Sequence, residues 1–356
     1  MKKERVVVAM SGGVDSAVAV ALLQRQGDEV IGITMCFNLP DYPKKRPSCC
    51  GLQGIEDARR VAHKLGIRHY VLNTQKVLQE RVIKDFCQEY IRGRTPNPCV
   101  RCNQYIKFDY LLKKALSLDA KFLATGHYAR ILKTEAGYQL KKAKDLFKDQ
   151  SYFLYRLNQN QLKHILFPLG NYTKNEVRML AREFSLPVAD KLASQEICFL
   201  PSNNYREFLK KYINTQIKPG LIVDKEGNVL GHHKGIAFYT IGQREGLGIA
   251  KGYPLYIAKL NLKNNQITVG TKEDILKKEF LVKATHFILK PPKKKIAVRA
   301  RIRYNHKEAP AEVIPIGNKM IIKFKEPQFA ITPGQSAVFY AKDRVLGGGI
   351  IDEVLD

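Results

Sequence analysis

The first 130 residues alternate between short apolar runs and stretches with helical spacing, and this alternation limits the fold more than any other feature. The apolar runs at 5–10, 29–37 and 68–74 contain β-branched residues, which suits strands buried on both faces. Helices are expected at 15–27, 54–67, 77–93 and 105–118, and a further strand with its turn at 121–129. Strands that alternate with helices predict an N-terminal α/β domain with a doubly wound parallel sheet.

The alternation fades after about residue 150, and the later sequence is typical of β-structure. From about 217, Gly-rich turns separate short apolar stretches, and from about 280 short strand-like segments follow one another closely. Closely spaced short strands favour a small β-barrel or sandwich, and we expect a barrel. We therefore predict three domains: an N-terminal catalytic domain over 1–205, a small β-rich central domain over 206–279 and a C-terminal β-barrel over 280–356.

The chain carries a large positive charge, with 60 Lys and Arg against 33 Asp and Glu and a net charge of +27. Such a chain suits a polyanionic partner, and nucleic acid is the commonest one in the cytoplasm. Lysines that only aid solubility would be scattered. The segment "LKPPKKKIAVRARIRYNHK" at 289–307 instead interleaves cations with Tyr304, which favours RNA or DNA as the partner.

The sequence predicts no membrane segment. It contains no run of roughly 18 apolar residues, the length that spanning requires. The basic start and first apolar run resemble a signal peptide, but Ser11, Gly12 and Asp15 interrupt the run too early. We therefore expect a cytoplasmic protein.

The turn "SGGVDS" at 11–16 stands between the first predicted strand and the first predicted helix. Ligands of doubly wound sheets bind at the carboxyl ends of the strands, and a helix N-terminus attracts anions. Gly12 and Gly13 allow close backbone approach, whereas Asp15 suits a phosphate only through Mg²⁺. The turn is neither a Walker loop nor a G-x-G-x-x-G motif. It resembles the phosphate-binding loop of the N-type ATP pyrophosphatases, which attack ATP at the α-phosphate.

The chain has seven cysteines, and their number and spacing favour chemistry over a disulfide framework. Cys99 and Cys102 form a C-x-x-C pair. A zinc site would need a second matching pair, and a thioredoxin-like motif would follow the first strand of its own βαβ unit. Cys102 precedes the helix predicted at 105–118 and has Arg101 and Lys107 nearby, so a nucleophile with a lowered pKa is expected. Neither Cys49 nor Cys50 is assigned a role.

Seven motifs occur in an order that resembles the tRNA-specific 2-thiouridylase family along nearly the whole chain. They are "AMSGGVDS", "NPCVRCN…IKF", "ATGHYAR", "KDQSYFL", "EICFL", "TIGQREGLGI" and "PGQSAVFY…VLGGGII". The resemblance implies a catalytic domain similar to the adenine nucleotide hydrolases, with Cys102 as the nucleophile and Cys198 as the carrier of a persulfide. It implies ATP contacts from Ala9, Met10, Ser11, Gly12, Gly13, Val14, Asp15, Ser16, Met35 and Gly126.

The same resemblance implies contacts with tRNA. Asn97, Pro98 and Cys99 would meet the target base, which we prefer over a metal-binding role for Cys99. Contacts elsewhere on the tRNA would come from His127, Lys148, Asp149, Gln150, Arg303, Tyr304 and Gln335. It also implies the wobble uridine of tRNAs for Lys, Glu and Gln as the target, ATP with Mg²⁺ as cosubstrate, and no metal held directly by a cage of protein ligands.

The implied reaction is adenylation of the uridine followed by replacement of oxygen with sulfur. The partners are a persulfide-donating sulfur carrier protein or cysteine desulfurase, and a cellular reductant that reopens a Cys102–Cys198 disulfide. Sulfur arrives either directly from the persulfide or as hydrosulfide. Two alternatives remain: an ammonia-using amidoligase of the same superfamily, which leaves the two cysteines unexplained, and a non-catalytic RNA-binding protein.

Overall fold

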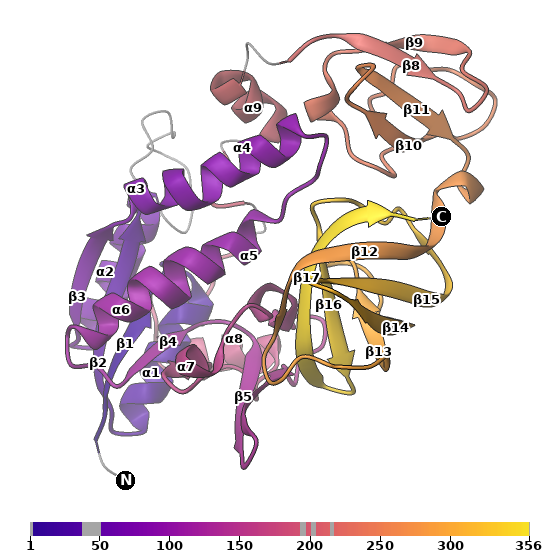
Figure 1. Ribbon diagram of the computed structural model, residues 1–356. Helices are drawn as coiled ribbons and strands as arrows, with labels where there is room; N and C mark the ends of the chain where they lie inside the picture. The colour runs from indigo at the N-terminus through magenta and orange to yellow at the C-terminus, as the bar shows by residue number, and fades with distance from the viewer. Residues whose placement is uncertain (1–2, 38–50, 193–196, 201–203, 214–216, 356) are drawn as a thin grey trace. The chain divides into compact units, whose positions relative to one another are not determined.

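The computed structural model describes residues 3–37, 51–192, 197–200, 204–213 and 217–355. The chain forms two compact units (Figure 1). Unit 1 comprises residues 1–82, 99–203 and 343–346, and unit 2 comprises 83–98, 204–342 and 347–356. Cys49 and Cys50 lie outside the described residues. Within the described chain, no helix combines the length and the apolar character needed to cross a membrane.

Unit 1 is built on a five-stranded parallel sheet in the order β3-β2-β1-β4-β7, which confirms the predicted α/β fold. Its strands are β1 (Arg5–Ala9), β2 (Glu29–Cys36), β3 (Arg68–Asn73), β4 (Phe122–Thr125) and β7 (Ile165–Leu166). Val8 of the central strand is in register with Gly32 on one side and Ala124 on the other. The strand order reverses between β1 and β4, and such a switch point opens a crevice at the carboxyl ends of the strands.

Three helices share a hydrophobic core with Val6 and Val8 of β1. They are α1 (Val14–Arg25), α2 (Leu52–Lys64) and α8 (Lys174–Glu183). The first two end as predicted, because Gly27 and Gly66 adopt the positive φ that follows a helix C-terminus. Thr173 caps α8 and forms a reciprocal capping box with Glu176. These helices anchor the turn between β1 and α1.

The helix predicted at 105–118 begins seven residues earlier, at Pro98, where a proline costs no hydrogen bond. It runs as α5 (Pro98–Cys102), the π-helix η2 (Asn103–Leu111) and α6 (Leu112–Leu116). Cys102 therefore lies inside a helix and not before one, which corrects the prediction. The helix expected at 77–93 is likewise divided, into α3 (Gln75–Leu78), the π-helix η1 (Gln79–Ile83) and α4 (Lys84–Ile91).

A hairpin in unit 1 was not predicted. It consists of β5 (Ala129–Thr134) and β6 (Gly137–Lys142), and it is followed by the 3₁₀-helix η3 (Ser151–Leu154) and α7 (Gln159–Leu162). Arg130 and Lys141 of this hairpin form ion pairs with Asp343. The partner acid stands some two hundred residues later, so the local sequence carries no sign of the pairing.

Unit 2 contains a small sheet in the order β10-β11-β8-β9, which confirms the β-rich central region. Its strands are β8 (Gly220–Val223), β9 (Val229–His233), β10 (Tyr256–Asn261) and β11 (Gln266–Gly270), with the 3₁₀-helix η6 (Ile236–Phe238). Helix α9 (Tyr205–Ile213) packs against α4 through the stacked rings of Tyr90 and Tyr205, whose centroids lie 5.1 Å apart.

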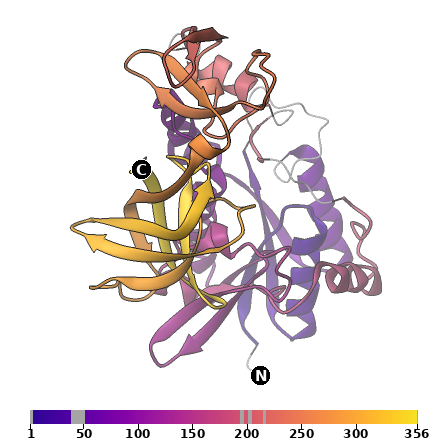
Figure 2. The ribbon, with the colours of Figure 1, turned by 90° about the vertical axis from the view of Figure 1, so that its right-hand side faces the viewer.

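The remaining strands form a closed six-stranded β-barrel, as predicted. They are β12 (Leu276–Phe287), β13 (Ile296–Arg301), β14 (Ala309–Ile316), β15 (Lys319–Phe329), β16 (Ser336–Ala341) and β17 (Arg344–Val354), with the 3₁₀-helix η7 (Glu273–Ile275) before β12. Pairing of β12 with β17 closes the barrel, and Phe280, Phe324 and Phe339 are buried. Figure 2 shows these strands from the side. β13 ends at Arg301, so Arg303 and Tyr304 lie in the bend and turn that follow the strand.

Candidate active site

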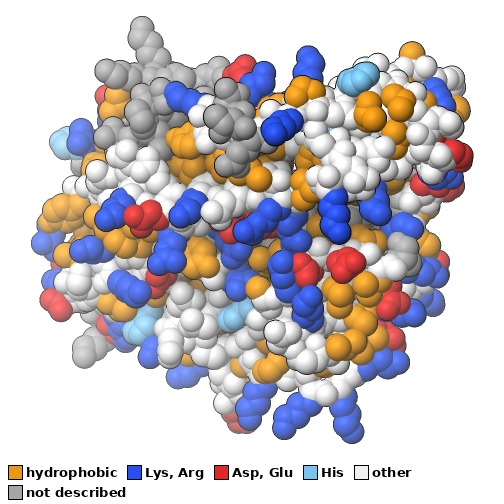
Figure 3. Space-filling view, turned by 45° about the horizontal axis from the view of Figure 1, so that its top comes forward, with side chains coloured by type: hydrophobic (Ala, Val, Ile, Leu, Met, Phe, Trp, Pro, Cys, Tyr) orange, Lys and Arg blue, Asp and Glu red, His pale blue; other side chains and the backbone are white. Residues whose placement is uncertain are grey.

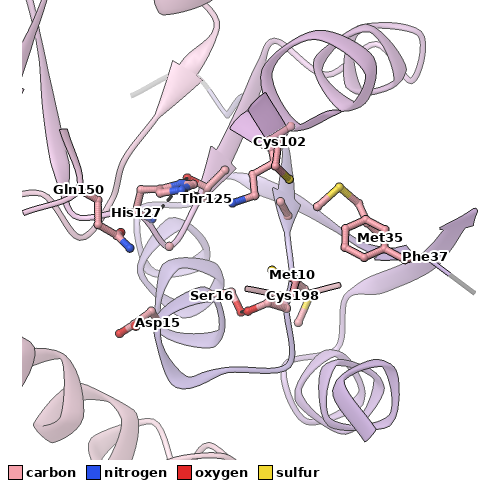
Figure 4. A pocket seen from close by; sticks show the side chains of 14 residues that line it. Met10, Asp15, Ser16, Met35, Phe37, Cys102, Thr125, His127, Gln150 and Cys198 are labelled. Carbon is pink, nitrogen blue, oxygen red and sulfur yellow. Dashed lines mark hydrogen bonds between the residues drawn. The ribbon is translucent and has the colours of Figure 1, made fainter. Parts of the chain in front are cut away.

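A pocket of about 210 Å³ lies in unit 1 where β1, β2 and β4 end (Figure 4). Most of the residues predicted for the site from the α/β domain line it. These are Ala9, Met10, Ser11, Asp15, Ser16, Met35, Cys102, Gly126, His127, Gln150 and Cys198. Phe37 and Thr125 also line the pocket and were not predicted. Lys107, which was expected only as a cation near Cys102, lines the pocket as well. Gly12, Gly13 and Val14 belong to the turn itself and are not among the lining residues.

The turn that follows β1 is held by Ser16. Its hydroxyl oxygen accepts a hydrogen bond from the backbone N–H of Ser11 at 3.2 Å and donates to the carbonyl oxygen of Gly13 at 3.1 Å. Gly13 is the N-cap of α1 and has no side chain to occupy the helix end. Asp15 and Ser16 in the first turn of α1 line the pocket, and a helix N-terminus in this position suits an anionic ligand.

Two glycines permit close approach around this turn. Gly12 has φ of +69°, and a Cβ there would lie 2.2 Å from the carbonyl oxygen of Gly54 in α2. A Cβ on Gly126, after β4, would lie 2.8 Å from the backbone nitrogen of Ser16. Any larger residue at either position would displace backbone, so the shape of the turn depends on both glycines.

Two lysines from the later part of unit 1 bind this turn. Lys191 donates to the carbonyl oxygen of Gly12 at 2.9 Å and forms an ion pair with the buried Asp57 at 2.5 Å. Lys174, the first residue of α8, forms an ion pair with Asp15 at 2.5 Å, and the Tyr128 hydroxyl donates to the same carboxylate oxygen at 2.8 Å. Lys174 is 159 residues from Asp15, and Lys191 is 179 residues from Gly12 and 134 from Asp57, so neither lysine was predicted from the sequence.

Cys102 and Cys198 line the same pocket, on different elements. Cys102 ends α5, and Cys198 lies in a turn at 198–199. Cys102 is a free thiol. Burial raises the pKa of Cys102 to about 11, and the Lys107 ammonium opposes this only in part. The prediction of a lowered pKa is therefore wrong for this structure, because Cys102 is inside a helix and desolvation outweighs the nearby cation.

Cys99 is not among the lining residues of the pocket. Burial, followed by the neighbouring thiols of Cys198 and Cys102, raises its pKa to about 12. In the described part of the chain, no group of three His, Cys, Asp or Glu side chains is arranged to hold a metal ion. The contact of Cys99 with a target base stays a prediction.

His127 follows β4 and is only 8% exposed. Its Nδ1 lies 2.7 Å from the Thr125 hydroxyl and its Nε2 lies 3.4 Å from Nζ of Lys107. Burial and the Lys107 charge hold the pKa of His127 well below its ordinary value, so the ring is neutral. Nε2 then accepts from Lys107, and Nδ1–H donates to Thr125. His127 was expected against tRNA, and the structure gives it a position inside the pocket.

The three residues expected against tRNA at 148–150 differ in their surroundings. Lys148 is exposed, and Gln150 lines the pocket while its side-chain oxygen accepts from the Tyr128 amide. Asp149 is buried, and its carboxylate accepts hydrogen bonds from the amides of Ala143 and Ser151 and from the Ser151 hydroxyl. Asp149 thus organises the loop, and a direct contact of its carboxylate with tRNA is not favoured.

In unit 2, the residues expected against tRNA also have structural partners. Arg303 donates to the carbonyl oxygens of Ala330 at 2.8 Å and Ile241 at 3.1 Å, and to the Thr332 hydroxyl. The guanidinium group of Arg301 lies over the Tyr304 ring. The Gln335 amide donates to the carbonyl oxygens of Thr95 and Pro96, directly before Asn97 and Pro98. Their contacts with tRNA stay predictions.

A glycine turn at the switch point of a parallel sheet, with two thiols in the same pocket, defines an α/β protein with a candidate ligand site at the carboxyl ends of its strands. Family models match three consecutive parts of the chain: a tRNA methyl transferase HUP domain at 4–202, a tRNA methyl transferase PRC-barrel domain at 206–271 and an aminomethyltransferase β-barrel domain at 277–351.

Similar proteins match almost end to end. The chain is 52% identical to tRNA-specific 2-thiouridylase MnmA 1 of Caldanaerobacter subterraneus subsp. tengcongensis, covering 98% of both chains. It is 48% identical to tRNA-specific 2-thiouridylase MnmA of Clostridium acetobutylicum, covering 98% of this chain and 99% of the other. A solved 4-thiouridine synthetase–RNA complex with bound ATP aligns at a TM-score of 0.36 and 17% identity over 60% of this chain and 51% of that one. The chain belongs to the tRNA-specific 2-thiouridylase family.

Proposed function

We propose that this protein uses ATP to replace the 2-oxygen of a uridine in tRNA with sulfur, and that the wobble uridine is the target. The observation that carries the proposal is the presence of Cys102, Cys198 and the phosphate-binding turn in one pocket. A carbonyl oxygen is a poor leaving group, so the exchange needs both an activating phosphate and a sulfur nucleophile. Amide activation by ATP alone would not need the two thiols.

In this proposal ATP lies along the carboxyl ends of the strands. The turn at 11–16 and the start of α1 would bind its phosphates, and Met35 and Gly126 would contact the adenosine. Among the described residues that line the pocket, Asp15 carries a carboxylate that could bind a metal ion, but this carboxylate is paired with Lys174. A Mg²⁺ ion entering with ATP would therefore be held mainly by phosphate oxygens and water, as magnesium commonly is. Bound Mg²⁺ would offset charge on the departing pyrophosphate.

Cys198 and Cys102 have different roles in the proposed sulfur transfer. The uridine oxygen attacks the α-phosphate, pyrophosphate leaves, and the base carries AMP as its leaving group. A donor of the sulfur carrier or cysteine desulfurase class delivers sulfane sulfur to Cys198 as a persulfide. By one route the terminal sulfur attacks the activated carbon and expels AMP, and Cys102 then cleaves the resulting disulfide. By the other, Cys102 first releases hydrosulfide, which attacks the carbon.

Either route leaves a Cys102–Cys198 disulfide, which a thiol reductant must reopen before the next turnover. Cys102 must lose its proton to attack, and Lys107 is the cation in the pocket that favours its thiolate. His127, held neutral, would accept a hydrogen bond from Lys107 and keep its ammonium beside the thiols. We assign Lys107 to thiolate stabilisation on these contacts.

The positive charge supports tRNA as the partner. Lys and Arg side chains spread over the face seen in Figure 3, with acidic side chains fewer among them. A target base must leave its stack to meet ATP and sulfur together, as for other base-modifying enzymes. We propose that residues 1–205 carry the chemistry, that 206–279 form the central domain, and that the barrel at 280–356 contacts tRNA.

The test is mass analysis of nucleosides from unmodified tRNA incubated with protein, ATP, Mg²⁺ and a persulfide source. We expect 2-thiouridine from the unaltered protein and none from the Cys198→Ala protein, although both bind tRNA. Undiminished 2-thiouridine from Cys198→Ala would overturn the sulfur assignment.

Full turnover by Cys102→Ser and Cys198→Ser proteins with ammonia as nucleophile would favour an amidoligase. Pyrophosphate release that requires both ATP and tRNA would exclude a non-catalytic RNA-binding protein.

A further inference from the structure

The loop at 143–151 carries the most exposed aromatic side chain among the residues that the structure describes. Phe147 is 96% exposed, and the adjacent Leu146 is 67% exposed. A single apolar side chain on a surface is ordinary. Here two large apolar side chains stand next to each other at the tip of one loop. Their exposure to water is unfavourable in the free protein, so a ligand that covers them would gain binding free energy.

The backbone of this loop is held in place at both ends. Asp145 accepts hydrogen bonds from the amides of Phe147 at 3.0 Å, Lys148 at 3.2 Å and Lys174 at 2.9 Å. Asp149 accepts from the amide of Ala143 at 3.1 Å, at the other side of the tip. Two carboxylates thus fix the turn from which Phe147 projects, and little backbone entropy remains to be lost when a ligand binds.

The surroundings favour nucleic acid over an apolar partner. Lys144 and Lys148 flank the two apolar side chains, and both are exposed; the Lys144 ammonium also pairs with Glu176 at 2.9 Å. A flat aromatic ring beside a cation suits an unpaired base, which stacks on the ring while a neighbouring phosphate meets Lys148. A membrane or a hydrophobic protein surface would have to remove those charges from water.

The loop also leads directly to the pocket. Gln150, three residues after Phe147, lines the pocket with the thiols. Three residues span at most about 11 Å of chain, so the Phe147 backbone lies within that reach of a pocket-lining residue. When the target uridine enters the pocket, a neighbouring base of the tRNA would lie close to the Phe147 ring.

We propose that Phe147, supported by Leu146, is a stacking platform for an unpaired base near the target uridine of bound tRNA. The inference deepens the proposed function and depends on tRNA being the substrate. It makes Phe147 a binding residue and not a catalytic one. Loss of the ring should therefore weaken tRNA binding and leave the sulfur chemistry of the bound complex intact.

The chain contains no tryptophan, so one introduced indole reports on its own position. We would prepare Phe147→Trp and, as a control, Met179→Trp on α8, where the native side chain is 61% exposed. Adding an anticodon stem–loop should quench the indole of Phe147→Trp strongly and that of Met179→Trp little. A fully paired RNA duplex of equal charge should quench neither, because it offers no unpaired base.

Affinity gives the second readout. Phe147→Ala should weaken stem–loop binding by about fivefold to a hundredfold, the range for loss of one stacked base, and Phe147→Trp should restore it. Normal binding by Phe147→Ala, or equal quenching by duplex and stem–loop, would overturn the platform while the unaltered protein still binds and thiolates tRNA. Absence of tRNA binding by the unaltered protein would instead overturn the proposed function. An unchanged thermal unfolding transition checks that each variant is folded.

Discussion

Nζ of Lys107 lies 3.4 Å from Nε2 of His127, in the pocket that Cys102 also lines. Lys107 stands five residues after Cys102, and in an α-helix the neighbours on one face are three or four residues apart. The π-helix η2 begins directly after Cys102, and its hydrogen bonds join residues five apart. This wider turn brings Lys107 to the pocket side, and the geometry leads to the first prediction.

Replacing Lys107 with Met should raise the pKa of Cys102 further, because the substitution removes the cation that lowers it. At a fixed pH near 8, alkylation of Cys102 should slow by up to about tenfold, the change for one pKa unit. Mass spectrometry of the Cys102 peptide measures the rate. Lys107→Arg keeps the charge and serves as the control. Equal rates for the Met variant and the unaltered protein would contradict the assignment of Lys107.

The rate of Cys102 alkylation in the ligand-free protein should depend steeply on pH. Burial raises the pKa of this thiol to about 11, so its thiolate fraction grows about tenfold for each pH unit between 7 and 10. The measurement is the alkylation rate at several pH values, compared with a small free thiol. A rate that levels off near pH 7 would show a thiol activated before any substrate binds.

Replacing Gly126 with Ala should distort the turn at 11–16, where we propose that ATP phosphates bind. The new Cβ would meet the Ser16 amide nitrogen at 2.8 Å, and backbone must shift to relieve the contact. We expect a loss of roughly 1–3 kcal/mol in the free energy of unfolding, the usual cost of overpacking, together with at least about tenfold weaker ATP binding. Denaturant unfolding and calorimetric titration measure the two effects.

Gly13→Ala is the matched control for stability in the same turn. Its φ is −101°, and its Cβ would find only the Ser11 hydroxyl, at 3.4 Å. Because Gly13 is the N-cap of α1, where Ala is less favourable than Gly, this variant should lose no more than about 1 kcal/mol, less than Gly126→Ala. Equal stability losses in the two variants would show that the turn tolerates no side chain at all and that the contact between Gly126 and α1 has no special part.

Replacing Arg303 with Ala should destabilise unit 2. The guanidinium group donates to the carbonyl oxygens of Ile241 and Ala330, and Ala330 keeps a second donor, the Thr332 hydroxyl. A hydrogen bond from a charged group contributes about 1.5–3 kcal/mol, so we expect a loss of that order. Thermal unfolding measures the loss. Arg303→Lys keeps the charge and loses the planar donors, so its stability should also be lowered. A normal unfolding transition in Arg303→Ala would contradict this role.

The same variants test the predicted contact of Arg303 with tRNA. If Arg303 also neutralises a phosphate, Arg303→Ala should lower the slope of log affinity against log salt by about one, and Arg303→Lys should retain it. Filter binding of tRNA across a salt series gives the slope. Lost stability with an unchanged slope would leave Arg303 as a residue that holds the loops of unit 2 together.

The sequence by itself determined the parallel sheet, its helices and the barrel strands. Continuous apolar runs mark buried strands, and glycines such as Gly27 and Gly66 end helices through positive φ. These signals are local, because backbone conformation depends on neighbouring residues. The turn at 11–16 was predicted for the same reason, since its place between a strand and a helix is visible in the chain.

Only the tertiary structure decided which distant residues meet. Lys174 reaches Asp15 across 159 residues and Lys191 reaches Gly12 across 179, and neither pairing leaves a periodic trace in the sequence. The pKa of Cys102 was predicted in the wrong direction, because charge near in sequence was weighed without burial. The burial of a side chain depends on the packing of the whole domain. The two cysteines could therefore be named as candidates from the sequence, but the protonation state of Cys102 could not be predicted from it.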